Sequence, residues 1–493
     1  MSDLNFPDNT SSPAKKNVAP PIKLQQTKRV KILATVGPAT LSEQKIKEML
    51  EAGTDGFRLN FSHGSHSEKL EAIKLIRAAS LKRGKPVAIV QDLHGPKISL
   101  SHFDGQGVSL DEDSIWKLQL NGELDVANNV LPVEFDLSKT AEVGQPVYIA
   151  DGRFRGEITD VKAKDKSISI KIINGGIVMP GKGLNLPETD FTGHIITQKD
   201  IKDVKFGADK GIDYVALSFV QSAEDVRYFK NLLKELGSPA KIISKIETKK
   251  AVDNLEEIIL ESDGVMVARG DLATEVGPES VPILQRKIIG LCIQNHKFSI
   301  VATQMLASMT ASPEPTRAEV SDVATAVIVG TDCVMLSEET AIGSYPVEAV
   351  ATMKRIILYT QGNNNVRAIF TNKPHQETIS EAIASTVIGL ANIVGAVAIV
   401  VETSTGVSAI NIASHRPERT IIAVTDNDTT AQQLAIVYGV KSFVRPVEKL
   451  AATKLTNWLG RGGVLNSGDV VVTASGHYPG KVGGTDTIKV RVI

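Results

Sequence analysis

From residue 31 onward, short apolar runs alternate with longer segments in which apolar residues recur every three or four positions. The short runs are typical of buried strands, and the longer segments are typical of amphipathic helices. The first three strands are expected at residues 31–36, in the run that ends at Asn60 and in the run that ends near Asp92. Strands that alternate with helices in this way predict a parallel sheet covered on both faces.

Residues 97–191 interrupt this rhythm with short alternating runs, such as SISIKIING, that are separated by Gly, Asp and Asn turns. This pattern is typical of an all-β unit. The strand-then-helix rhythm then resumes, with strands expected at 213–219, 242–247, 264–271, 299–304 and 333–339. The two blocks together make eight units, which predict a (β/α)8 TIM barrel with an inserted small β-barrel lid domain.

A third series of apolar runs begins after about residue 361 and predicts a C-terminal open α/β domain. It starts with a helix in EAIASTVIGLANIV and a strand in AVAIVVE, and it ends with the strand IKVRVI. The expected division of the chain is a disordered N-terminal tail (1–27), the first part of the barrel (28–95), the inserted lid (96–192), the second part of the barrel (193–361) and the C-terminal domain (362–493).

Composition narrows the class of protein without naming its chemistry. A formal net charge of -1 over 493 residues provides no basic field for nucleic acid or an anionic membrane surface. No run reaches the roughly 18–20 apolar residues of a membrane helix, and the polar tail lacks the apolar centre of a signal peptide. Cys292 and Cys333 lie in apolar runs, which argues against a disulfide framework or zinc cluster and favours a reducing, cytoplasmic compartment.

Candidate chemistry gathers at the carboxyl ends of the expected barrel strands, where TIM barrels carry their active sites. Each such residue alone could be a solvated loop residue, but seven strands deliver polar side chains to one face. In strand order these residues are Arg58, Asn60, Ser62 and His63; Asp92; Ser218; Lys245 and Glu247; Arg269, Gly270 and Asp271; Thr303 and Gln304; Glu338 and Glu339.

Glu247 and Asp271 are hard oxygen ligands on neighbouring strands, and two carboxylates that leave positions for water and substrate are a usual site for Mg²⁺. Lys245 precedes Glu247 by two residues, so both side chains are expected on the same side of their strand. An ammonium group beside a metal suits a substrate whose negative charge grows during reaction. The alternative is a Lys–Glu pair at the surface.

Arg58 stands in the apolar run GFRLNF, near the end of the second strand. A guanidinium group in this position is suited to clamp a phosphate, although an inter-strand salt bridge would explain the same residue. Backbone amides near Gly270 could face a carboxylate or phosphate where a helix begins. Thr303 could position a substrate or pass a proton.

These motifs resemble those of one family. FRLNFSHG, SKIE, MVARGDL, ATQML, PTRAEVSDVA and MLSEETAIGSYPVEAV are similar to the signatures of pyruvate kinases, and the similarity extends from about residue 28 to the C-terminus. The resemblance implies an enzyme that transfers the phosphoryl group of phosphoenolpyruvate to ADP, giving pyruvate and ATP, with Mg²⁺ or Mn²⁺ as cofactor. It also implies a homotetramer and a lid that closes over the nucleotide.

The resemblance further implies a role for each matching residue. Glu247 and Asp271 would bind the divalent metal, and Arg58 and Lys245 would contact the phosphoryl group, with Lys245 also stabilising the enolate. The substrate carboxylate would be held by Gly270, Asp271 and Thr303, and Thr303 would also lie near the proton path to the enolate. The residues implied on the nucleotide side are Asn60, Ser62, His63 and Lys182.

One departure from the family pattern concerns potassium. Potassium-dependent members have a Thr-Lys-Gly-Pro-Glu run where this chain has Leu93-His94-Gly95-Pro96-Lys97, a pattern that resembles potassium-independent members. The ammonium group of Lys97 could supply the charge of a monovalent cation, so we expect that potassium is not required. The residues that match the cation ligands are Asn60, Ser62, Asp92 and Leu93 through its carbonyl.

Other departures concern reaction rate. Ser99 stands where most members have an arginine that touches nucleotide phosphates, and Glu338 stands where they usually have glycine. These two residues would support the alternative of a weakly active relative that senses metabolites. Another metal-dependent barrel that binds an enolate, such as an aldolase, is disfavoured by the lid and the nucleotide-side residues.

The C-terminal domain carries a segment that matches the family's effector phosphate loop. Its candidate residues are Thr403, Ser404, Thr405 and Ser408, beside Gly406. Hydroxyl groups and backbone amides in a glycine turn can bind phosphate, which would make a sugar phosphate the effector. A simple cap between strand and helix explains the same residues.

Overall fold

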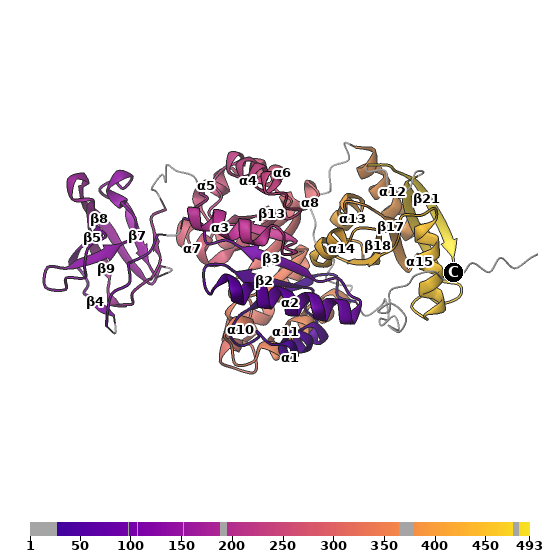
Figure 1. Cartoon of the computed structure of the whole chain (residues 1–493), viewed down its shortest axis with the longest axis horizontal. Coiled ribbons are helices and arrows are strands. Elements are labelled where there is room, and N and C mark those ends of the chain that lie inside the picture. Colours follow the sequence, from indigo (N-terminus) through magenta and orange to yellow (C-terminus); the bar gives the residue numbers. More distant parts are fainter. Residues whose placement is uncertain are drawn as a thin grey trace, which may run out of the picture.

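The computed structural model describes residues 27–96, 98–105, 107–150, 152–187, 195–363, 378–476 and 483–493. Residues 1–26 of the expected tail and Lys97 therefore lie outside the described residues. The barrel occupies the middle of the molecule, with the inserted β unit at one end and the C-terminal α/β unit at the other (Figure 1).

Eight parallel strands close into a barrel, which confirms the predicted fold. Around the ring the order is β1–β16–β15–β14–β13–β12–β3–β2. The strands are β1 (Lys31–Val36), β2 (Gly56–Asn60), β3 (Ala88–Asp92), β12 (Tyr214–Leu217), β13 (Lys241–Ile246), β14 (Gly264–Ala268), β15 (Phe298–Ala302) and β16 (Cys333–Leu336). Several of them end earlier than expected, because the polar residues that follow belong to turns or to the first turn of a helix.

Several of the helices that surround the barrel begin at Ser or Thr capping residues that are visible in the sequence. Capping boxes, in which a Ser or Thr side chain and an acid three residues later satisfy each other's backbone amides, start helices α2, α3, α4 and α9. The barrel helices are α1 (Glu43–Ala52), α2 (His66–Arg83), α3 (Gln198–Gly207), α4 (Ala223–Glu235), α5 (Lys249–Asp253), α6 (Leu255–Glu261), α7 (Arg269–Val276), α8 (Val281–Gln294), α9 (Arg317–Val329), α10 (Glu338–Ala341) and α11 (Pro346–Gly362).

The inserted unit is all-β, as predicted, and its strands enclose their own apolar core. A six-stranded sheet has the order β11–β7–β8–β9–β5–β6, and β10 pairs with β4 in a second, two-stranded sheet. These strands are β4 (Val108–Leu110), β5 (Ile115–Leu120), β6 (Val130–Val133), β7 (Pro146–Ile149), β8 (Phe154–Lys162), β9 (Ser167–Asn174), β10 (Gly176–Val178) and β11 (Leu184–Asn185).

The C-terminal unit is an open sheet with helices on both faces (Figure 1). Strands β19, β18, β17 and β20 are parallel, and β21 pairs antiparallel to β20. Its elements are α12 (Ile379–Ile393), β17 (Ala398–Glu402), α13 (Val407–Ser414), β18 (Thr420–Thr425), α14 (Asp428–Gln433), β19 (Val440–Val444), α15 (Ala451–Arg461), β20 (Val470–Gly476) and β21 (Thr485–Val492).

The C-terminal unit seals the amino-terminal end of the barrel. Ile436 joins the apolar cluster inside the barrel, and the Tyr214 hydroxyl donates a hydrogen bond of 2.8 Å to the carbonyl of Gln433. Nearby, the buried Arg416 guanidinium lies 2.6 Å from the Asp332 carboxylate. Because the C-terminal unit covers the amino-terminal end, the carboxyl-terminal end of the barrel is the end that faces the inserted unit (Figure 1).

In the part of the chain that the structure describes, no helix is long and apolar enough to cross a membrane.

Candidate active site

The ammonium group of Lys245 is largely buried at the carboxyl end of the barrel. The Nζ atom of Lys245 lies 2.7 Å from Glu247 Oε1 and 3.4 Å from Asp92 Oδ1, and it donates a hydrogen bond of 2.8 Å to the Ser218 hydroxyl. Burial by itself would lower the pKa of Lys245, but the Asp92, Glu247 and Asp271 carboxylates raise it above its ordinary value. Lys245 is therefore held as a charged group.

Asp92 connects this ammonium group to a second cation. Arg58 Nε donates a hydrogen bond of 2.6 Å to Asp92 Oδ2, and Arg58 also reaches the Thr35 hydroxyl at 3.2 Å. Burial opposes ionisation of Asp92, but Lys245 and Arg58 outweigh it and lower the pKa of the carboxyl. The salt bridge foreseen as an alternative for Arg58 is present, and it aims the guanidinium group at the same end of the barrel as Lys245.

One of the two carboxylate oxygens of Glu247 has no hydrogen-bond partner among the described residues. Its Oε2 accepts a hydrogen bond of 2.8 Å from the Phe219 amide, whereas its buried Oε1 has only the Lys245 ion pair and no hydrogen-bond partner. Burial, with the nearby Asp271 carboxylate adding to it, raises the pKa of Glu247 despite Lys245. The Glu247 and Asp271 carboxylates repel each other in this buried site, so the pair fits a divalent metal.

No group of three or more His, Cys, Asp or Glu side chains in the described ranges is arranged to hold a metal by itself. A metal at Glu247 and Asp271 would therefore take its remaining ligands from water and substrate, which is the usual arrangement for Mg²⁺. Asp271 lies in the first turn of α7 and is half-buried.

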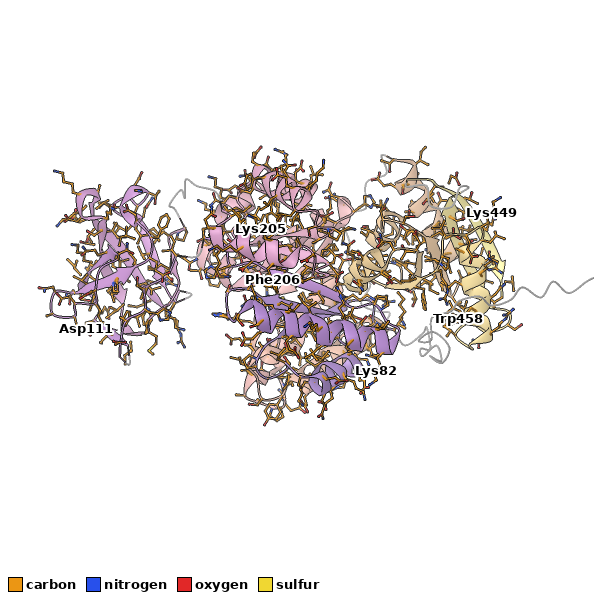
Figure 2. The ribbon with its side chains drawn as sticks, viewed as in Figure 1. Lys82, Asp111, Lys205, Phe206, Lys449 and Trp458 are labelled. Carbon is orange, nitrogen blue, oxygen red and sulfur yellow. The ribbon has the colours of Figure 1, made fainter. Side chains whose placement is uncertain are left out.

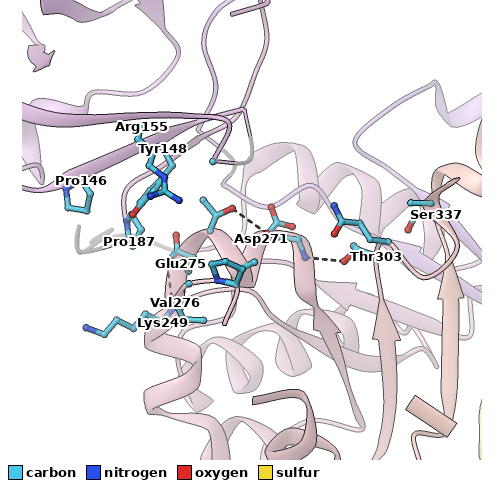
Figure 3. Close-up of a pocket in the computed structure, with 18 of the residues that line it drawn as sticks. Pro146, Tyr148, Arg155, Pro187, Lys249, Asp271, Glu275, Val276, Thr303 and Ser337 are labelled. Atoms are coloured by element: carbon cyan, nitrogen blue, oxygen red, sulfur yellow. Dashed lines mark hydrogen bonds between the residues drawn. The ribbon is translucent and has the colours of Figure 1, made fainter. Parts of the chain in front are cut away.

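Thr303 and Gly270 lie together where β15 ends and α7 begins. The Gly270 amide donates to the Thr303 hydroxyl at 3.0 Å (Figure 3). That hydroxyl donates to the Ala302 carbonyl at 2.7 Å. Thr303 and Gln304 both have left-handed backbone conformations, with φ values of 67° and 54°. Such conformations are uncommon for residues with a side chain and often occur at functional sites.

The guanidinium group of Arg269 holds this turn in place. From the sequence, Arg269 was noted only as a residue at the end of a strand. Its guanidinium donates to the Thr303 carbonyl at 2.6 Å and to the Ala302 carbonyl at 3.2 Å, and it forms 2.7 Å hydrogen bonds with both Asp322 carboxylate oxygens.

Ser218 was also noted from the sequence only as a strand-end residue. In the structure its hydroxyl accepts a hydrogen bond from Lys245 and donates one to the Leu93 carbonyl, so it links the two residues.

A cavity of about 810 Å³ extends from Thr303 along α7 to the inserted unit. One wall carries Gly270, Asp271 and Glu275, and the facing wall carries Tyr148 and Arg155 of the inserted unit (Figure 3). Since both walls contribute, movement of the inserted unit would open or close this cavity.

The residues expected on the nucleotide side lie on two parts of the molecule. Asn60 is at the end of β2 and accepts a hydrogen bond of 3.0 Å from the Ser62 amide, and His63 is exposed in the same turn. Lys182 is exposed on the inserted unit, where its carbonyl accepts a hydrogen bond of 2.9 Å from the Leu100 amide. The structure therefore does not bring Lys182 together with the turn after β2 by any contact between described residues.

The proposed potassium ligands are largely engaged with protein groups. Both Asp92 oxygens face cations, and the Leu93 carbonyl accepts a hydrogen bond of 2.8 Å from Ser218. Of the other departures, Ser99 donates at 3.2 Å to Glu134 within the inserted unit, and Glu338 is exposed on the cavity wall near Thr303.

The expected effector residues form the turn between β17 and α13. The Gly406 amide donates to the Thr403 hydroxyl at 2.9 Å, and the Ser404 carbonyl accepts from Thr430 at 2.9 Å. The Ser408 hydroxyl lies 2.8 Å from that of Thr485. The Thr405 carbonyl accepts at 3.4 Å from Lys241, a residue of the barrel.

Comparison with known proteins gives this geometry a family. The family model of the pyruvate kinase barrel domain matches residues 27–350 of this chain. The family model of the pyruvate kinase alpha/beta domain matches residues 381–491. The chain belongs to the pyruvate kinase family. It has the activity of a pyruvate kinase, and the family implies phosphoenolpyruvate and ADP as substrates and a requirement for a divalent metal.

Individual relatives are similar over nearly the whole chain. Pyruvate kinase 2 of Synechocystis is 38% identical over 476 residues, which cover 94% of this chain and 79% of the relative. The pyruvate kinase of Geobacillus stearothermophilus is 39% identical over 472 residues, which cover 94% of this chain and 80% of the relative. A Staphylococcus aureus pyruvate kinase is 36% identical over 479 residues, with 94% and 80% covered.

Glu275 gives the contact between barrel and inserted unit a dependence on pH. Its carboxyl is hydrogen-bonded to Asn185 of the inserted unit, and burial raises its pKa to about 7. A folded-state pKa above the ordinary value of 4.5 means that the folded enzyme favours the protonated carboxyl, so stability is lost as the pH rises toward about 7.

We predict that Glu275→Gln stabilises the enzyme above neutral pH, because the amide stays neutral where the carboxyl must ionise. The midpoint of thermal unfolding is measured for the variant and for wild type at pH 5 and at pH 8. The variant should exceed wild type by more at pH 8 than at pH 5. The exposed control Glu279→Gln should show no such change between the two pH values. A difference that is the same at both pH values would contradict the prediction.

Proposed function

We propose that Lys245, Arg58 and Thr303 are the catalytic residues for transfer of the phosphoryl group from phosphoenolpyruvate to ADP. The supporting observation is the buried Lys245 ammonium, which lies 2.7 Å from Glu247 and 3.4 Å from Asp92 at the carboxyl end of the barrel. As the bond from phosphorus to the enol oxygen breaks, negative charge develops on that oxygen. A fixed cation in a buried site stabilises this charge far more than water does.

The substrate is proposed to lie between two sets of groups. Arg58 and Lys245 face its phosphoryl group, and a guanidinium oriented by Asp92 can form paired hydrogen bonds with phosphate oxygens. Gly270, Asp271 and Thr303 hold its carboxylate through amides at the start of α7 and the Thr303 hydroxyl. This arrangement keeps the transferring group over Lys245 and the carboxylate over α7.

Mg²⁺ or Mn²⁺ is the divalent ion that we propose for Glu247 and Asp271. When bound, the ion polarises the phosphoryl and enolate oxygens and neutralises their charge. Glu247 contributes Oε1, the buried oxygen without a hydrogen-bond donor, and Asp271 contributes its half-buried carboxylate. Lys245 adds a second positive charge that does not depend on the ion.

ADP is proposed to bind at the turn after β2, where Asn60, Ser62 and His63 lie, with Lys182 brought over it by the inserted unit acting as a lid. Lid closure excludes water, which would otherwise take the phosphoryl group. After transfer, carbon 3 of the enolate accepts a proton to give pyruvate, and the Thr303 hydroxyl is positioned by Gly270 and Ala302 beside the carboxylate end of the substrate.

The remaining proposals concern organisation. We propose that the chain is divided at the five segment limits expected from its sequence and that it forms a homotetramer in the cytoplasm. We also propose that a sugar phosphate binds as effector at the turn that contains Thr403 and Ser408. Support for the effector comes from Gly406, whose φ of 89° opens the turn at the start of α13. The alternative of a weakly active sensor is disfavoured because Lys245, Glu247 and Asp92 lie together in one charge network.

We predict that Glu247→Gln weakens divalent metal binding by at least about tenfold, because the site loses one of its two charges. Titration with Mn²⁺ in the absence of substrates, followed by electron paramagnetic resonance, measures this without reference to turnover. The exposed control Glu257→Gln on α6 should bind Mn²⁺ like wild type. Equal affinity in Glu247→Gln and wild type would show that the metal binds elsewhere.

We also predict that the enzyme does not require potassium, because Lys97 supplies the positive charge. Pyruvate formation should change by less than about twofold when sodium replaces potassium, since twofold corresponds to well under 1 kcal/mol in the barrier. Lys97→Glu should become strongly potassium-stimulated, whereas the exposed lid control Lys164→Glu should not. Strong stimulation of the wild-type enzyme by potassium would contradict the proposal.

A further inference from the structure

Lys69, in the first turns of α2, lies beside the turn that follows β2. Its Nζ atom lies 5.8 Å from the centre of the Phe61 ring. A Cβ atom added to Gly64 would stand 3.4 Å from the same Nζ atom. The side chain therefore bends back over residues 61–64, the segment that contains Ser62 and His63.

The start of α2 is anchored, so this placement of Lys69 is not a property of a loose chain end. The Ser65 and Glu68 side chains form a capping box. His66 stacks on Phe206 with ring centres 4.3 Å apart, and Phe206 lies on α3 at the surface of the barrel (Figure 2). Lys199, also on α3, donates to the Phe61 carbonyl at 2.5 Å and so fixes the same turn from the other side.

The neighbouring carboxylates are already committed to other groups. Glu68 Oε2 accepts a hydrogen bond of 2.7 Å from the Ser65 amide. Asp203 lies 2.6 Å from His66 through one oxygen and 2.6 Å from Lys199 through the other. Across the described residues, Lys69 has no ion pair or hydrogen bond, only its contact with the Phe61 ring.

Lys69 shares this rim of the barrel with two other cations, Arg58 and Lys199. Burial lowers the pKa of Lys69, and Arg58 and Lys199 lower it further, while Glu68 and Asp203 act in the opposite direction. Burial is the largest cause of this lowering, because the ammonium group loses water and gains no hydrogen bond from the described residues in its place. An anion bound here would supply the missing partner and offset the cost of burial.

We propose that Lys69 binds the diphosphate of the nucleotide substrate. This inference rests on the proposed function, in which ADP lies at the turn after β2. Around the barrel ring, β2 stands opposite β14, the strand that leads into α7 and the proposed carboxylate site. Lys69 is thus on the far side of the site from the groups that hold the carboxylate of phosphoenolpyruvate.

The inserted unit gives a further reason to expect a cation of the barrel at the phosphates of ADP. Ser99 has no charge, and its hydroxyl points to Glu134 within the inserted unit. Lys182 is exposed on that unit and has to be carried to the nucleotide by lid closure. Lys69 is in place before the lid closes, so it would contribute to the first encounter with ADP.

The test compares Lys69→Gln, Lys69→Arg and the control Lys74→Gln, an exposed lysine on the same helix. Loss of one charged contact to phosphate should raise the KM for ADP by about tenfold or more and leave the KM for phosphoenolpyruvate within about twofold. Lys69→Arg should retain most of the affinity for ADP, and Lys74→Gln should match wild type. Circular dichroism confirms that each variant is folded.

Calorimetric titration of the metal-containing enzyme with ADP and with AMP gives a readout that does not depend on turnover. The wild-type preference for ADP over AMP should shrink in Lys69→Gln, because one phosphate contact is lost. An unchanged KM and affinity for ADP, or an equal rise in both KM values, would overturn the proposal. Absence of pyruvate formation by the wild type would instead refute the proposed function, while the ADP titration would still test Lys69.

Discussion

The proposed active site depends on keeping the Lys245 ammonium group charged inside the barrel. Removing a cation from water is strongly unfavourable unless opposite charges and hydrogen bonds replace the solvent. Asp92, Glu247 and the Ser218 hydroxyl provide that replacement. Their strands, β3, β12 and β13, are neighbours in the ring, and β2 with Arg58 comes next. One half of the ring therefore carries the charge network, and the other half carries the turn around Thr303.

The two ends of the barrel have separate tasks. At the amino-terminal end, Ile436 packs against the apolar centre of the barrel, and the Arg416–Asp332 ion pair also joins the barrel to the C-terminal unit. At the carboxyl-terminal end, side chains meet a cavity whose second wall belongs to the inserted unit. This separation would allow the inserted unit, proposed above as a lid, to move while the C-terminal unit holds the strands, and hence the charges, in register.

Much of this could be predicted from sequence, because barrel strands and polar strand ends are local patterns. Lys245, Glu247, Asp92 and Arg58 were all expected at one face. Their pairing was not predicted, since Lys245 of β13 meets Asp92 of β3 across the intervening β12, and this contact depends on side-chain direction within the ring. The left-handed backbone at Thr303 was missed for a similar reason, because Arg269 holds it through carbonyl contacts. The strand ends were placed too late where polar residues begin α7.

The most direct test of this account is pyruvate formation from phosphoenolpyruvate and ADP by Lys245→Met, compared with wild type and the exposed control Lys230→Met. Methionine keeps the volume of the side chain and removes its charge. If the buried ammonium stabilises the developing enolate, kcat should fall by about 100-fold to 1,000-fold in a folded variant, with the control unchanged. A folded Lys245→Met enzyme that turns over within about tenfold of wild type would contradict the account.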